Sequence, residues 1–124
     1  MKEYQFFGSH KYLVVPLCKM DEDEFIKEPT SSPRLKVVEF TDPKKFGKYI
    51  MADFIFEIAE KCDAEWLDDF ESQILYPDKL PTAIEIVSKA IKLKKNASFV
   101  DYLEQTKEMM ELALSLGTLI EFAF

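Results

Sequence analysis

The chain has 124 residues, of which 48% are hydrophobic and 31% charged, and its net charge is −7. These values predict one globular domain and not a disordered chain, because enough apolar surface exists to offset the entropy of ordering. The acidity disfavours direct binding of nucleic acid or of most membrane surfaces. No apolar run approaches the roughly 20 residues that a membrane-spanning helix requires.

The N-terminal segment MKEYQFFGSHKYLVVPL has no uninterrupted apolar core and no small-residue cleavage site. We interpret it as structure and not as a signal peptide. Cys18 and Cys62 are far apart in the sequence and form no C-x-x-C motif. Without a secretion signal, they are expected to be reduced thiols of a cytoplasmic protein.

The first third of the chain predicts strands. Residues 3–17 read as a β-hairpin, because EYQFF and KYLVVPL are rich in aromatic and β-branched residues around a turn at Gly8. Pro16 suggests an edge position or a strand end. Residues 21–33, DEDEFIKEPTSSP, predict a flexible acidic loop, and a short strand is expected near 34–40.

The remainder predicts helices. Asp42 and Pro43 begin an amphipathic helix that spans about 43–61, with apolar residues every four positions. Asp63 can cap a second helix over about 64–75. A third begins at Pro81 or Thr82, where Thr82 and Glu85 fit a capping box.

Ser98 can cap a fourth helix, which Gly117 is well placed to end in the left-handed conformation. The tail, residues 118–124, can form a final strand beside the N-terminal sheet. The whole chain, residues 1–124, is therefore expected to form a single α+β domain. A small, mostly antiparallel sheet, built from the N-terminal hairpin, the strand near 34–40 and a possible C-terminal strand, would pack against about four helices.

The residues that catalysis or metal binding usually require are scarce. His10 is the only histidine, and a zinc site needs about four suitably spaced ligands. Residues 21–24 are acidic but lack the glycine and spacing of a calcium loop. The three glycines are isolated, so no phosphate-binding loop is present. We therefore predict no catalytic residues, no metal and no cofactor.

One acidic stretch exceeds the ordinary pattern. DAEWLDDFESQ, residues 63–73, holds five acids within nine residues around the only tryptophan, and no Lys or Arg occurs from Asp63 to Asp78. The plain interpretation is the solvated face of a capped helix. The alternative is a negative patch for a basic partner, with an aromatic anchor. The residues predicted to bind that partner are Asp63, Glu65, Trp66, Asp68, Asp69, Glu71 and Tyr76.

Three hypotheses follow for the function. The first is a non-catalytic binding protein of the inhibitory or immunity type, which neutralises a basic partner such as a nuclease toxin. The second is a structural or adaptor homodimer, with an exposed apolar patch near Phe122 and Phe124 or an unpaired sheet edge near Pro16. The third is an enzyme of unfamiliar type, whose pocket would gather polar groups from several elements. Its candidate residues are Tyr49, Asp53, Glu57 and His10.

Overall fold

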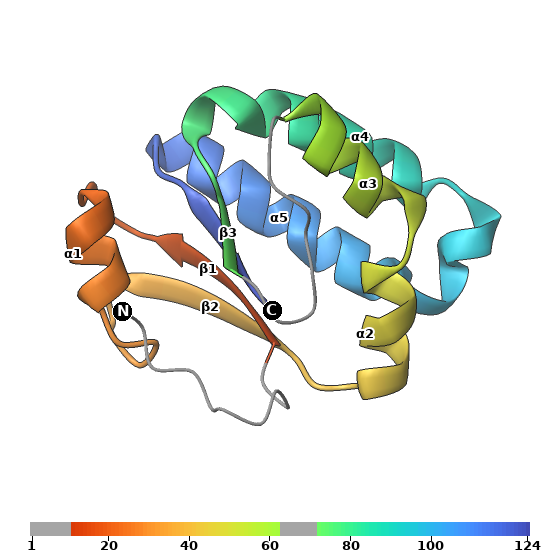
Figure 1. Cartoon of the computed structure of the whole chain (residues 1–124), viewed down its shortest axis with the longest axis horizontal. Helices are drawn as coiled ribbons and strands as arrows, with labels where there is room; N and C mark the ends of the chain where they lie inside the picture. The colour runs from red at the N-terminus through yellow and green to blue at the C-terminus, as the bar shows by residue number, and fades with distance from the viewer. Residues whose placement is uncertain (1–10, 63–71) are drawn as a thin grey trace.

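The computed structural model describes residues 11–62 and 72–124, and these residues form an α+β fold (Figure 1). Four strands make one antiparallel sheet in the order β2-β1-β4-β3. The strands are β1 (Lys11–Pro16), β2 (Leu35–Phe40), β3 (Ser72–Leu75) and β4 (Ile120–Ala123). The α-helices are α1 (Glu22–Lys27), α2 (Pro43–Ile50), α3 (Asp53–Lys61), α4 (Leu80–Ile91) and α5 (Val100–Leu116). The predicted fold class is confirmed.

The C-terminal strand is the centre of the sheet. β4 pairs with β1 on one side, where Leu13 lies opposite Phe122, and with β3 on the other, where Leu75 lies opposite Ile120. The predicted final strand is thus confirmed, and it returns to the N-terminal part of the chain. β4 is hydrogen-bonded on both edges and therefore connects β3 to β1 in the sheet.

β1 is an interior strand, not an edge strand. Both of its edges are paired, by β2 and β4, so Pro16 marks a strand end and not an edge. The predicted hairpin partner, residues 3–7, lies outside the described residues. The strand predicted near 34–40 is confirmed as β2, and it runs antiparallel to β1 from Leu35 to Phe40.

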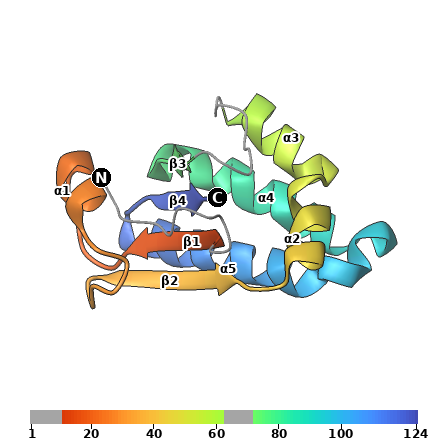
Figure 2. The same cartoon turned by 60° about the horizontal axis from the view of Figure 1, so that its bottom comes forward.

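The main core lies between one face of the sheet and helices α2 to α5. α4 packs along α5, α3 packs on α4, and α5 lies against β1 and β4 (Figure 2). Alternation along the strands points Leu13, Phe40 and Phe122 into this layer, where they meet a fully buried Tyr49. Phe40 lies at the centre of an aromatic cluster, with its ring 4.4 Å from that of Tyr102 and 5.0 Å from that of Tyr49.

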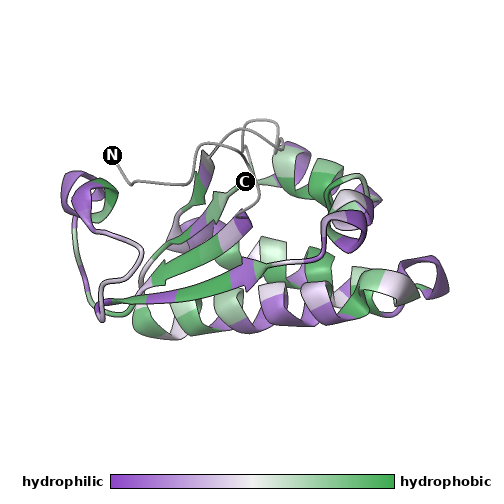
Figure 3. Ribbon diagram, turned by 90° about the horizontal axis from the view of Figure 1, so that it is seen from below, coloured by the Kyte–Doolittle hydropathy of each residue, from purple (hydrophilic) through white to green (hydrophobic). Residues whose placement is uncertain are grey.

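The opposite face of the sheet carries a smaller core. Phe25 of α1 is fully buried there against Val14, Leu35, Leu119 and Ala123. α1 lies at the end of the sheet away from α2 (Figures 1 and 2). The ribbon of α1 is mostly hydrophilic, as expected for a short helix that buries a single side chain (Figure 3).

The prediction of a loop over residues 21–33 is wrong for its first half, because this segment contains α1. Asp21 caps the helix, as its carboxylate accepts a 2.7 Å hydrogen bond from the Glu24 N–H. Arg34 then pairs with Glu24 at 2.6 Å and with Glu28 at 3.4 Å. The cap and the buried Phe25 stabilise a helix in a segment whose composition is typical of loops, and the ion pairs add little.

The single helix predicted over 43–61 is two helices. Its start is confirmed, since Asp42 accepts hydrogen bonds from the N–H groups of Lys44 and Lys45. The chain leaves the helical conformation at Met51 and Ala52, and α3 begins at Asp53. A side chain every four residues drifts by about 40° per step around a straight helix. The break between α2 and α3 allows both apolar stripes to face the core.

The helix predicted over 64–75 is wrong at its end. Ser72–Leu75 is β3, in which Leu75 is buried. The apolar residues of this segment fit a helical stripe and a short strand equally well, and pairing with the free edge of β4 decides between them. Residues 63–71 lie outside the described residues.

The last two predicted helices exist as α4 and α5, with different starts. α4 begins at Leu80 without a side-chain cap, so the predicted capping box is wrong. α5 begins at Val100 after a 3₁₀ segment, Lys94–Phe99, and Ser98 does not cap it. The predicted end is confirmed, because Gly117 adopts the left-handed conformation with φ 68°.

Tyr49 should make the stability of this core depend on alkaline pH. Its hydroxyl is 2.8 Å from Thr106 Oγ1, which itself donates to the Tyr102 carbonyl. Burial raises the pKa of Tyr49 above its usual range, and the hydrogen bond to Thr106 opposes this only in part. The neutral phenol is therefore favoured by folding, so its stabilising contribution is complete below the unfolded pKa of about 10 and is lost as the pH rises above it.

We expect Tyr49→Phe to cost about 1 kcal/mol of unfolding free energy at neutral pH, because one buried hydrogen bond is lost. The gap between wild type and variant should narrow at about pH 10.5, where the unfolded wild type ionises at this position. Urea denaturation at both pH values measures the gap. A constant gap would contradict the expected contribution of Tyr49.

Candidate functional site

Tyr76 is the one residue of the predicted partner-binding set that the structure describes. Its side chain is 43% exposed, and it follows the end of β3 directly before a 3₁₀ turn, Pro77–Lys79. The other six predicted residues lie within 63–71, outside the described residues. That stretch precedes β3 whereas Tyr76 follows it, and the four residues of the strand span roughly 13 Å.

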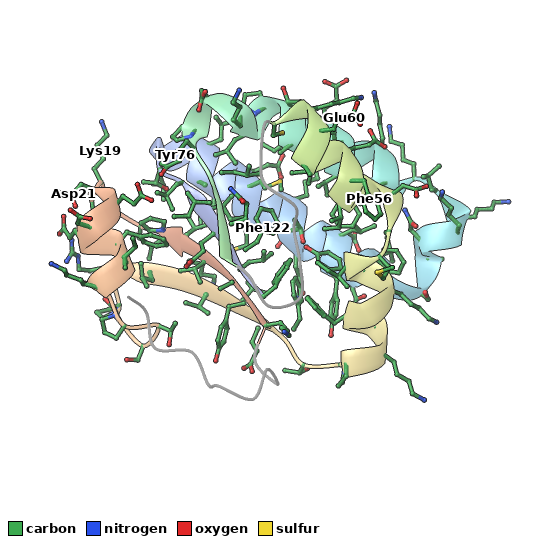
Figure 4. The ribbon with its side chains drawn as sticks, in the orientation of Figure 1. Lys19, Asp21, Phe56, Glu60, Tyr76 and Phe122 are labelled. Carbon is green, nitrogen blue, oxygen red and sulfur yellow. The ribbon has the colours of Figure 1, made fainter. Side chains whose placement is uncertain are left out.

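Tyr76 lines a groove of about 500 Å³ at the end of the sheet, called the α1 groove below. Its lining residues come from three segments of the chain: 16–22 with Glu24, 76–77, and 117–119. Lys19, Asp21 and Tyr76 gather at this end of the molecule, whereas Phe122 lies at its centre and Phe56 on α3 (Figure 4). The start of α1 forms one wall, and the turn between α5 and β4 forms another.

The lining combines apolar side chains with carboxylates. Pro16, Met20, Pro77 and Leu119 supply apolar surface. Asp21, Glu22 and Glu24 supply three carboxylates, against one ammonium group from Lys19. Such a lining can hold an amphipathic ligand, with its apolar part on the side-chain surface and a positive charge near the rim.

The three carboxylates are engaged to different degrees. Glu24 is paired at 2.6 Å with Arg34, a residue that does not line the groove. Glu22 accepts a hydrogen bond from the Tyr76 hydroxyl. The pKa of Tyr76 is raised mainly by burial, and further by this hydrogen bond and by the negative charge of Glu22. Asp21 accepts the Glu24 N–H with one oxygen. Among the described residues, no Lys or Arg forms an ion pair with Asp21 or Glu22, so both carboxylates can receive a positively charged ligand.

Thr118 adds a polar group that lacks a protein partner. Its backbone N–H bonds to the Ala113 carbonyl at 2.9 Å, in the turn that Gly117 makes possible. Its side chain is buried, and among the described residues its Oγ1 has no hydrogen-bond partner. An unsatisfied buried hydroxyl is unfavourable in a native protein, so its presence beside a groove points to a ligand atom.

A second hollow, of about 420 Å³, lies between α2, α3 and the segment before α5. Lys48, Asp53 and Lys95 line it, together with Met51, which is 71% exposed. Asp53 and Lys95 neutralise each other across 2.6 Å. Lys48 is exposed and has no ion-pair partner among the described residues, but the hollow contains neither an unpaired carboxylate nor a buried polar atom without a partner.

Three of the four polar residues predicted for an enzyme pocket are engaged elsewhere. Tyr49 is fully buried and bonds to Thr106, Asp53 pairs with Lys95, and Glu57 forms a surface ion pair with Lys61 at 3.6 Å. His10 lies outside the described residues. Within residues 11–62 and 72–124, no group of three or more His, Cys, Asp or Glu side chains is arranged to hold a metal ion.

The features predicted for a homodimer are also absent where the structure describes them. Phe122 is fully buried and Phe124 is 8% exposed, because β4 carries them into the main core. The predicted apolar patch is therefore wrong. The predicted sheet edge near Pro16 is also wrong, because β1 lies between β2 and β4 and Pro16 itself pairs with Leu35 of β2. Of the helices described here, none is both long and apolar enough to cross a bilayer.

Sequence reasoning identified Tyr76 but missed the other residues of the α1 groove. One signal was available: Asp21 followed by three acids is typical of a capped helix start, as carboxylates favour the first turn. Thr118 gave no such signal, because its isolation depends on three segments that are distant in sequence. No protein-family model matches the chain, and comparison with curated proteins and with solved structures found no significant match.

Proposed function

We propose that the protein is a non-catalytic binding domain of the inhibitory or immunity type, which neutralises a basic protein partner such as a nuclease toxin in the cytoplasm. The α1 groove is the observation that carries this proposal. It places Tyr76 beside the uncompensated carboxylates of Asp21 and Glu22, over an apolar floor. Aromatic anchors bordered by charge are typical of protein interfaces, where the charge accelerates association and the anchor supplies affinity.

The distribution of charge supports the same partner. Residues 63–124 hold six Lys and Arg against twelve Asp and Glu. A field of this sign attracts basic proteins and repels nucleic acid, so an inhibitor of this type would compete for a basic active site. The acids from Asp63 to Glu71 remain part of the proposed surface, together with Tyr76.

The test begins with purification of a partner from the native host at low salt and again at about 0.5 M NaCl, where the screening length is about 4–5 Å. Association of the purified pair is then followed by stopped flow. We expect Asp68→Lys with Asp69→Lys to slow association about tenfold or more and to flatten its salt dependence.

The control variant makes the same change in net charge at a different place, on α5. Glu108→Lys with Glu111→Lys alters two exposed acids of α5. It should slow association clearly less than the Asp68 and Asp69 variant, because local charges act most strongly within a screening length. Equal effects of the two double variants, or no effect of either, would refute an acidic docking surface at this stretch.

A further inference from the structure

We propose that the α1 groove binds a linear basic segment of the partner. A Lys or Arg of that segment would lie between Asp21 and Glu22, an adjacent apolar side chain would contact Met20 and Leu119, and an N–H group would donate to Thr118 Oγ1. This inference rests on the proposed function and specifies which part of the partner enters the groove.

The dimensions of the groove favour a peptide segment. Its volume of about 500 Å³ lies within the range of sites that enclose a ligand of several residues or of drug size. It is formed by the ends of β1 and α5 and by the start of α1. The Leu17 N–H donates to the Arg34 carbonyl at 2.8 Å beside the end of β1, and the fully buried Phe25 holds α1 on the sheet. The walls are therefore largely formed before a ligand binds.

The charges of the groove select a cation. Asp21 caps α1 and Glu22 is its first residue, while Glu24 is already paired with Arg34. Lys19, the opposing charge in the lining, is exposed and can turn toward solvent or toward a carbonyl of the bound segment. An anionic segment would meet two uncompensated carboxylates at the same place and would be rejected.

Thr118 distinguishes a ligand site from a merely acidic surface. A hydroxyl that is buried without a partner destabilises the folded state, and valine has nearly the same shape without the polar atom. If the hydroxyl serves the fold alone, its removal should leave binding unchanged. If it receives a donor from the ligand, its removal should weaken binding while it stabilises the free protein.

The experiment uses the full chain and three probes: the hexapeptide ALKLRA, its acidic counterpart ALELEA, and spermine. Amide resonances are followed by NMR during titration. We expect ALKLRA to shift the resonances of residues 20–24 and 117–119, and ALELEA to shift none of them. Spermine lacks the apolar side chains and the backbone N–H donors, so its effect should be small.

The variants then test each contact. Thr118→Val should weaken ALKLRA binding about five- to tenfold and raise the melting temperature by about 2–4 °C. Asp21→Asn with Glu22→Gln should also weaken binding; Asn still caps the helix, and Gln can still accept from Tyr76. The matched control is Asp23→Asn, an exposed acid of the same turn that does not line the groove.

Several results would overturn the inference: no shift in the groove at millimolar ALKLRA, equal shifts with spermine, or full affinity in Thr118→Val. The same experiments distinguish failure of this inference from failure of the proposed function. If a basic partner binds through Asp68 and Asp69 but ignores the groove variants, the proposed function stands and the groove inference fails. If ALKLRA binds the groove and no basic partner exists, the proposed function fails instead.

Discussion

Phe122→Ala is expected to lower the free energy of unfolding by about 3–5 kcal/mol. Phe122 is fully buried in β4, between β1 and β3, and its ring lies 5.6 Å from that of Phe124 in an edge-on arrangement. Removal of the ring costs its transfer free energy and leaves a cavity that two paired neighbours prevent from collapsing. A domain is typically stable by about 5–15 kcal/mol, so this one change removes a large part.

Urea denaturation at neutral pH measures the loss. Leu114→Ala is the control, because Leu114 is 40% exposed on α5 and alanine suits a helix; its effect should stay within about 0.5 kcal/mol. Phe122→Leu should fall between the two, since it keeps part of the apolar volume. A loss for Phe122→Ala as small as that of Leu114→Ala would mean that β4 is not the centre of the sheet.

The sequence predicts those parts of the fold that local chemistry determines. Asp42 and Pro43 begin α2 because Asp42 caps its first N–H groups and Pro43 has the φ that the first turn requires. Gly117 ends α5 because it tolerates a positive φ. The C-terminal strand was predicted in the short segment, rich in apolar residues, that follows the helix end at Gly117. Each of these signals lies within a few residues of the feature that it specifies.

The features that sequence reasoning missed depend on distant residues. Ile74 and Leu75 become a strand because β4, some 45 residues later, offers a free edge. The break at Met51 follows from the surface that α2 and α3 must cover, and no glycine or proline marks it. The candidate site behaves in the same way: Tyr76 stood out as an aromatic near acids, but its contact with Glu22 and the isolation of Thr118 arise only in three dimensions.

α1 connects the smaller core to the candidate site. A helix of six residues is too short to be stable alone, since isolated helices below about 12–15 residues are marginal in water. Its ion pairs with Arg34 are exposed and contribute little. The burial of Phe25 must therefore supply most of the free energy that holds α1 on the sheet, and with it the positions of Asp21 and Glu22.

Phe25→Ala should consequently release α1 and destroy the α1 groove while most of the sheet survives. Removal of a fully buried ring costs about 3–5 kcal/mol, but the measured loss cannot exceed the free energy that docks α1, so we expect about 3 kcal/mol or less. Hydrogen exchange is the sharper measurement. The Phe25 and Glu28 amides, which donate to Asp21 O and Phe25 O, should exchange nearly as fast as in an unfolded chain, whereas those of β1 and β4 should stay protected.

Asp23→Ala provides the matched control, because this side chain is exposed on the same helix and should leave the exchange of α1 unchanged. Affinity for ALKLRA should fall in Phe25→Ala at least as much as in the Asp21→Asn with Glu22→Gln variant, because both carboxylates lose their positions together. If the α1 amides stay protected while the whole protein loses stability, α1 and the sheet unfold as one unit, and the groove is as rigid as the core. If protection is lost but ALKLRA still binds at full affinity, the carboxylates of α1 do not recognise it.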